Sequence, residues 1–189
     1  MDGSRRLSQA ISEGDGISVV ARVTDLDSAR AAEEHGAEAL AVATPVPGLR
    51  EATSLPVLWL GEGLADGADA CLLRVAEADD DLEQLHRAIV EGGYECVVDV
   101  SNEEELELAL ERLEPEIFLI SPREAEEDDE PLDRVLELLP DVPAGKLAIA
   151  EVPSADRDAV SALERAGFDA VLVGRPHVAD LVGTEPRPV

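Results

Sequence analysis

The chain has 189 residues, and 45% of them are hydrophobic, which is enough for one sizeable core, with no linker that suggests a second. Only 2% are aromatic, so the core must be built from Val, Leu, Ile and Ala, as in parallel strands covered by helices on both faces. The formal net charge of -28 excludes nucleic acid and anionic membranes as expected partners, because both need a cationic surface.

Strands and helices are predicted to alternate after a polar N-terminal stretch that contains a short helix near Leu7 to Ile11. Apolar, β-rich runs predict the strands, and Gly36 and the Gly92-Gly93 pair predict helix ends. In the first half we expect strand Ile17–Val23, helix Asp25–His35, strand Ala37–Ala43, a stub of helix in Pro45–Ser54, strand Pro56–Leu60, connection Gly61–Asp69, strand Ala70–Val75 and helix Asp79–Glu91.

The second half is more regular, and Ser or Asn residues at helix starts predict the caps. We expect strand Glu95–Val100, a helix from Ser101-Asn102 to Leu113, strand Ile117–Ser121, an acidic loop Glu124–Glu130, helix Pro131–Leu139, strand Leu147–Val152, helix Ser154–Ala166 capped by Ser154, strand Ala170–Gly174 and helix Pro176–Val182.

Eight strands alternating with helices predict an α/β fold, a closed (β/α)8 TIM barrel. Such barrels typically need about 250 residues, so this one must be trimmed, with very short or missing helices after strands 2 and 3. The alternative is an open doubly wound sheet, which usually has a glycine-rich first turn that Val23–Asp27 lacks. We expect a single domain over 1–189, with an extension (1–16), the barrel (17–182) and a tail (183–189).

The acidity has two explanations. It is either an acidic interaction surface or an adaptation to a high-salt cytoplasm, where salt screens self-repulsion. The acids are spread along the chain and Lys146 is the only lysine, which favours the second. No signal peptide or membrane-spanning apolar run is found, so we expect a cytoplasmic protein that does not enter a membrane.

The two cysteines, Cys71 and Cys96, lie in apolar runs and are expected to be buried, reduced thiols. They lack the CxxC or Cys/His spacing of a zinc site. The acidic loop Glu124–Glu130 lacks the ligand order of a calcium loop, and no glycine-rich nucleotide loop occurs. The sequence therefore predicts neither a metal site nor a cofactor.

Six stretches resemble the indole-3-glycerol-phosphate synthase family, in the same order and at similar spacing over nearly the whole chain. They are Ala10–Ala21, Gly36–Leu40, Leu55–Leu58, Gly67–Leu73, Val97–Leu106 and Ala166–Gly174, which are similar to the first five strands and the eighth. The resemblance implies a carbon–carbon lyase of tryptophan biosynthesis. Its reaction closes an indole ring, with loss of carbon dioxide and water, from an anthranilate-derived ribulose phosphate.

The resemblance also implies a lysine general acid, a second lysine, glutamates, an asparagine and a phosphate pocket, and most of these are replaced here. The first strand's Glu-x-Lys falls on Arg22 and Thr24, the third strand's lysine on Leu60, the fifth strand's glutamate on Asp99, and the asparagine near Ile120 or Ser121. Glu151 matches, but Val152-Pro153 replaces the Ser-Gly that follows it, and Gly174 of the phosphate pocket matches, with Arg175 after it.

The lysine positions predict that normal synthase activity is absent. Lys146 falls at the N-terminal end of the seventh strand, on the face of the barrel opposite to catalysis. Arginine cannot replace a lysine general acid, because its pKa is too high to release a proton.

Strand alternation and the resemblance place Arg22, Arg74, Asp99, Glu151 and Arg175 at the C-terminal rim. One interpretation is a structural cluster of ion pairs that fills a former active site, because unpaired buried charge is costly. The other is a pocket in which Arg22, Arg74, Gly174 and Arg175 hold a phosphorylated or carboxylated small molecule, with Glu151 or Asp99 as base.

Two functions follow from these interpretations. The first is a noncatalytic scaffold, regulator or small-anion binder. The second is a lyase or isomerase that acts on a phosphorylated small molecule with Glu151 and Asp99 as acid and base. The shortened second and third helices leave barrel wall uncovered, and we expect a partner or a second copy of the chain, in a homo-oligomer, to bury it.

Overall fold

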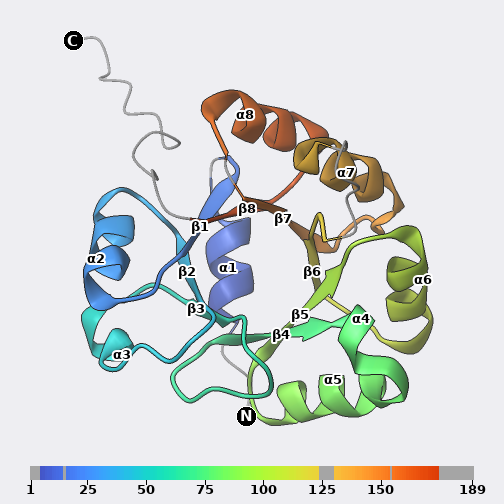
Figure 1. The fold of residues 1–189 in the computed structure, drawn as a ribbon, viewed down its shortest axis with the longest axis horizontal. Coiled ribbons are helices and arrows are strands. Elements are labelled where there is room, and N and C mark those ends of the chain that lie inside the picture. The colour runs from blue at the N-terminus through green and yellow to red at the C-terminus, as the bar shows by residue number, and fades with distance from the viewer. Residues whose placement is uncertain (1–4, 15, 124–129, 154, 175–189) are drawn as a thin grey trace.

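The computed structural model describes residues 5–14, 16–123, 130–153 and 155–174. Within them, eight parallel strands close into a barrel, in which each strand pairs with the next and β8 pairs with β1 (Figure 1). The strands are β1 (Ser18–Arg22), β2 (Ala39–Val42), β3 (Val57–Trp59), β4 (Ala70–Arg74), β5 (Glu95–Val100), β6 (Ile117–Ile120), β7 (Leu147–Val152) and β8 (Ala170–Val173). The predicted TIM barrel is confirmed, and the open sheet is excluded.

Helices surround the barrel on its outer side (Figure 1). They are α2 (Leu26–Glu34), α3 (Leu49–Ala52), α4 (Val75–Ala78), α5 (Leu82–Glu91), α6 (Glu103–Arg112), α7 (Pro131–Leu138) and α8 (Arg157–Ala166), with 3-10 turns η1 (Asp79–Asp81) and η2 (Leu139–Asp141). As predicted, the helix after β2 is a stub of four residues, and no helix lies between β3 and β4. The shortened and missing helices therefore lie on one side of the barrel, after β2 and β3.

The starts of α6 and α8 test the predicted caps. Asn102 caps α6 as expected, since its side chain accepts a hydrogen bond from the Glu105 N–H. The prediction for α8 is wrong, because Asp156 is the cap and accepts from the Ala159 N–H. Ser154 itself lies outside the described residues, as do most of the predicted acidic loop (124–129) and the predicted final helix.

Strand side chains alternate between two apolar layers, as a barrel requires. The inner layer fills the barrel, and its buried members include Val20, Leu58, Leu72, Val97 and Ile149. The outer layer lies between the strands and the helices. Both layers consist mainly of aliphatic side chains, in agreement with the composition. The same alternation turns polar residues at the strand ends towards the barrel axis.

The N-terminal end of the barrel is closed by helix α1 (Arg6–Ser12), which crosses the middle of the barrel in the view of Figure 1. Leu7 is 0% exposed and Ile11 is 2% exposed, and both join the inner layer. The Glu95 carboxylate, at the start of β5, accepts hydrogen bonds from the N–H groups of Leu7 (2.7 Å) and Ser8 (3.1 Å). These donors would otherwise be unsatisfied at a helix start, so Glu95 anchors α1 to the barrel.

Three strand starts at this end share one local pattern. A glycine with positive φ is followed two residues later by a carboxylate, which accepts from a backbone N–H of the preceding strand. The three sets are Gly36, Glu38 and Val19 N (3.2 Å); Gly67, Asp69 and Val57 N (2.8 Å); and Gly167, Asp169 and Ala148 N (2.8 Å). The pattern joins β2 to β1, β4 to β3 and β8 to β7.

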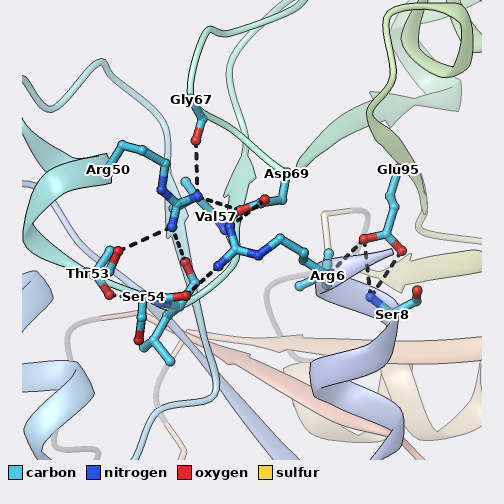
Figure 2. A network of polar contacts seen from close by, with 11 residues as sticks. Arg6, Ser8, Arg50, Thr53, Ser54, Val57, Gly67, Asp69 and Glu95 are labelled. Atoms are coloured by element: carbon cyan, nitrogen blue, oxygen red, sulfur yellow. Dashed lines mark hydrogen bonds and ion pairs between the residues drawn. The ribbon is translucent and has the colours of Figure 1, made fainter. Parts of the chain in front are cut away.

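Asp69 is the most heavily bonded of these carboxylates (Figure 2). It also accepts from Arg6 Nη1 and Arg50 Nη1, each at 2.8 Å, and is 8% exposed. Arg6 lies on α1 and Arg50 on α3, so one carboxylate ties both helices to β4. The polar groups at this end of the barrel are therefore hydrogen-bonded to one another. The predicted site residues lie at the opposite end.

Candidate functional site at the barrel mouth

Four predicted site residues lie at the C-terminal ends of the strands. Arg22 ends β1, Arg74 ends β4, and Asp99 and Glu151 each lie one residue before the ends of β5 and β7. Arg74 and Asp99 are direct neighbours in the register of β4 and β5. The structure thus brings together the two acids and two of the three arginines that the sequence predicts. Arg175 and the rest of 175–189 lie outside the described residues.

Arg22 and Glu151 form the first ion pair of the mouth. Arg22 Nη2 donates to Glu151 Oε1 at 2.7 Å, across the 129 residues that separate them in sequence. The Arg22 side chain is 41% exposed, and that of Glu151 is 23% exposed. Among the described residues, the buried Nε of Arg22 has no hydrogen-bond acceptor. The Arg22 side chain is therefore partly exposed, whereas this Nε donor lies buried beneath it.

Asp99 is the centre of a second, more deeply buried group and is 2% exposed. Its Oδ1 accepts from the Ser121 hydroxyl at 2.7 Å, and its Oδ2 lies 3.1 Å from Arg123 Nη1 and 3.8 Å from Arg74 Nε. Burial raises the pKa of Asp99 to about 6, and the nearby negative charge of Glu151 adds to the rise. Arg123, the Ser121 hydroxyl and Arg74 act in the opposite direction.

Arg123 and Glu105 belong to this group, although neither is among the site residues predicted from the sequence. Arg123 Nη2 lies 3.3 Å from Glu105 Oε2, and the same carboxylate oxygen accepts from the Ser101 N–H at 2.8 Å. Inward positions along β6, counted from Ile117 in steps of two, lead to Ser121, whereas Arg123 lies past the end of the strand and is not reached by this count.

The positions where the family has lysines carry other side chains. Leu60 is 3% exposed and belongs to the inner apolar layer, whereas Thr24 is exposed just beyond β1. Lys146 directly precedes β7 at the N-terminal end of the barrel, as predicted. Because Lys146 is the only lysine in the chain, none is available at the mouth.

Gly174 lies directly after β8, where the ends of β7 and β8 approach closely. A Cβ atom added at Gly174 would lie 2.8 Å from the Pro153 carbonyl oxygen, so a side chain does not fit without movement. A packing role accounts for this glycine without a phosphate. The predicted phosphate-binding role of Gly174 and Arg175 stays a prediction.

The described residues offer neither a metal site nor a reactive thiol. No group of three or more His, Cys, Asp or Glu residues there could hold a metal ion. Cys71 and Cys96 are free, buried and adjacent in the register of β4 and β5. Burial raises the pKa of both thiols, to about 12 for Cys96, so they are poor nucleophiles. No helix in the described part of the chain is long and apolar enough to cross a membrane.

Two solved structures share the fold. The N-acetylmannosamine-6-phosphate 2-epimerase from Clostridium perfringens aligns with a TM-score of 0.68 at 16% identity, covering 84% of this chain and 86% of that one. The 3-hexulose-6-phosphate synthase from Salmonella typhimurium aligns with a TM-score of 0.65 at 17% identity, covering 88% of this chain and 94% of that one. At these identities the likeness supports the barrel fold alone.

Sequence comparison identifies the family. An indole-3-glycerol phosphate synthase from Alkaliphilus metalliredigens is 33% identical over 146 residues, which are 76% of this chain and 56% of the relative. One from Variovorax paradoxus is 31% identical over 172 residues, 89% of this chain and 64% of the relative. The chain thus spans about three fifths of the length of these relatives. Because the family profile of indole-3-glycerol phosphate synthase also matches residues 60–180, the chain belongs to that family.

Proposed function

We propose that this chain is a noncatalytic member of the indole-3-glycerol phosphate synthase family that binds a small anion at its barrel mouth. The observation that carries the proposal is the pairing of the mouth's carboxylates with arginines, in a chain that has no lysine at the mouth. Asp99 lies against Arg123 and Arg74, and Glu151 pairs with Arg22.

The absence of a lysine argues against synthase chemistry. The resemblance implies a general acid that gives a proton to a leaving hydroxyl group, and a guanidinium group cannot do so at neutral pH. Leu60 occupies the position of the lysine acid and is buried in the apolar interior.

Anion binding is supported by the arginines of the mouth. Three guanidinium groups, from Arg22, Arg74 and Arg123, lie there beside the carboxylates of Asp99, Glu151 and Glu105, and Arg74 also lies 3.8 Å from Glu77. Protonation of Asp99 near its pKa of about 6 would remove one of the negative charges that oppose an anion. Guanidinium groups bind phosphate and carboxylate oxygens with charge-assisted hydrogen bonds, so both are suitable ligands. Scaffold and regulatory roles are compatible with such binding.

The raised pKa of Asp99 favours a second candidate, a lyase or isomerase that acts on a phosphorylated small molecule. A carboxyl group with a pKa of about 6 can both give and take a proton near neutral pH. In this case Asp99 and Glu151 would act as acid and base without a lysine.

An assay with the family's anthranilate-derived ribulose phosphate, at high salt, tests the loss of synthase activity. We expect no indole product above the buffer blank and no rescue of a tryptophan auxotroph in a salt-tolerant host. Product formation that disappears in Glu151→Gln would overturn the proposal. Exchange of substrate C–H protons with D2O, dependent on Asp99, would instead support the second candidate.

Titration with inorganic phosphate at constant ionic strength tests anion binding. We expect the melting temperature to rise with phosphate in the wild-type chain and to rise much less in Arg22→Gln. Arg5→Gln is the matched control, because Arg5 is 74% exposed and pairs with Glu116, away from the mouth. An equal rise in all three proteins would contradict a site at Arg22.

A further inference from the structure

The side of the barrel between β3 and β4 lacks a helical cover. The connection runs through residues 60–69 without a helix, although every other connection between consecutive strands carries at least a short one among the described residues. In Figure 1 only loop segments lie in the ring between α3 and α5. Parallel barrel strands are normally covered by a helix on their outer face. The helix expected between β3 and β4 is the one that is missing.

Two hollows flank this connection, with volumes of about 590 and 660 Å³. Leu64 lies at the centre of the connection, is 48% exposed and lines both hollows. The two hollows together form what we call the β3–β4 surface. Its lining is mainly apolar and includes Val46, Leu49, Trp59, Leu64, Leu85 and Ile89. Leu64 and Leu85 (40% exposed) are two of the three large hydrophobic residues exposed on the described part of the chain.

The rim of the β3–β4 surface is acidic. Glu51 and Asp66 line one hollow, Glu62 and Glu77 line the other, and all four are exposed. The arginines of the surface are already engaged. Arg50 bonds to Asp69 and the Leu55 carbonyl, and Arg74 donates to the Leu60 carbonyl and lies near Asp99. The surface therefore offers an apolar floor between carboxylates.

We propose that the β3–β4 surface binds an amphipathic helix of another protein, with an apolar stripe flanked by arginines or lysines. A helix fits because it would take the place of the barrel helix missing at this position. Basic flanks fit because they would meet the rim carboxylates. A second copy of this chain is disfavoured, since each copy carries a net charge of -28 and would bring its own acids to the contact. The inference does not depend on whether the barrel mouth is catalytic.

Trp59 provides an internal reporter for this surface. It is the only tryptophan in the chain and, like Leu64, lines the larger hollow. Its indole N–H donates to the Glu62 carbonyl at 3.2 Å, and its ring lies so close to Gly61 that a Cβ there would collide with it. A helix seated in the hollow would exclude water from the indole and shift its emission to shorter wavelength.

The test uses three synthetic peptides of about 14 residues, close to the mean length of a protein helix. The first has leucines at positions i, i+3, i+4 and i+7 with arginines at the flanks. The second has the same composition without the period, and the third carries glutamates in place of the arginines. We expect saturable 1:1 binding, with a blue shift of Trp59 emission, for the first peptide alone. Equal binding of the first two would show nonspecific attraction to an acidic protein and overturn the proposal.

Two variants localise the binding. Leu64→Ser should weaken it about tenfold or more, because an exposed leucine that becomes buried contributes at least that factor. Val90→Ser is the matched control, since Val90 is 51% exposed on α5 and does not line either hollow, and should bind as the wild type does. Unchanged affinity in Leu64→Ser would overturn the proposal. Self-association of the peptide-free chain that requires Leu64 would do so too, and would assign the surface to a second copy.

Discussion

The Asp99 carboxyl group lies between Arg74, Arg123 and the Ser121 hydroxyl and is almost fully buried. Its pKa of about 6 is above the value of about 3.9 expected in an unfolded chain. The folded protein therefore binds this proton more tightly than the unfolded one between these pH values. The linked stability is fully present below about pH 4 and is lost as pH rises through about 6.

Asp99→Asn should remove this pH dependence. Two pKa units correspond to roughly 2–3 kcal/mol, so the free energy of unfolding of the wild type, relative to the variant, should fall by about that amount between pH 4 and pH 7. Urea unfolding at constant salt measures both curves. Asp27→Asn is the control, since Asp27 is 98% exposed in its pair with Arg30, and it should run parallel to the wild type. A parallel curve for Asp99→Asn would contradict the raised pKa.

The sequence predicts mouth residues only as far as strand alternation extends. Arg22, Arg74, Asp99 and Glu151 lie within predicted strands, so their inward direction follows from counting in steps of two. Arg123 follows Pro122, past the end of β6, where alternation no longer fixes a direction. Its contacts with Asp99 and Glu105 depend on the path of the chain after the strand, which no local pattern specifies.

At the scale of elements, strands are more predictable than helix starts. Each strand is a short apolar run bounded by turn residues, so its presence follows from the sequence, although its limits do not: the predicted Ala37–Ala43 is Ala39–Val42 in the structure. Ser154 is the predicted cap of α8, whereas the structure uses Asp156, a residue type that also suits this position. Residue preference alone does not decide between two suitable residues so close together in the chain.

Helix α1 shows how a short element gains importance from its location. Seven residues form an unstable helix in isolation, so tertiary contacts must hold it. Leu7 supplies an apolar side chain to the barrel interior, and Glu95 binds the first N–H groups of the helix. The sequence indicates the helix, but not that it closes the barrel.

Leu7→Ala should destabilise the barrel by about 2–5 kcal/mol, because it leaves a cavity beside the inner layer. Gln9→Ala on the same helix is the control, since the Gln9 side chain is exposed and donates to Glu13 of the same turn, and it should cost less than about 0.5 kcal/mol. Chemical unfolding measures both variants. Equal stability of the two would mean that α1 does not contribute to the core.

The whole molecule combines an aliphatic barrel with a charge of -28. Composition predicts both features, since a parallel barrel can be built with few aromatic residues and the acids fall mainly on exposed positions. Composition does not reveal which acids are structural. Asp69, Glu95 and Asp99 each bind specific donors. The 43 acidic residues of the chain outnumber its 15 lysines and arginines, so the surplus of negative charges must repel itself.

Salt should therefore raise the stability of this protein. Screening shortens the range of repulsion from about 10 Å at 0.1 M salt to about 3 Å at 1 M, so we expect the melting temperature to rise by several degrees over this range in KCl. A variant with Glu34→Gln, Glu91→Gln and Glu111→Gln provides a matched test, because these exposed acids lie in the last turns of α2, α5 and α6, where the helix dipole disfavours them. It should be more stable than the wild type at low salt and gain less from added KCl. A melting temperature that does not change with salt, or an equal gain in the variant and the wild type, would show that self-repulsion does not limit stability. The explanation of the acidity as an adaptation to high salt would then lose its physical basis.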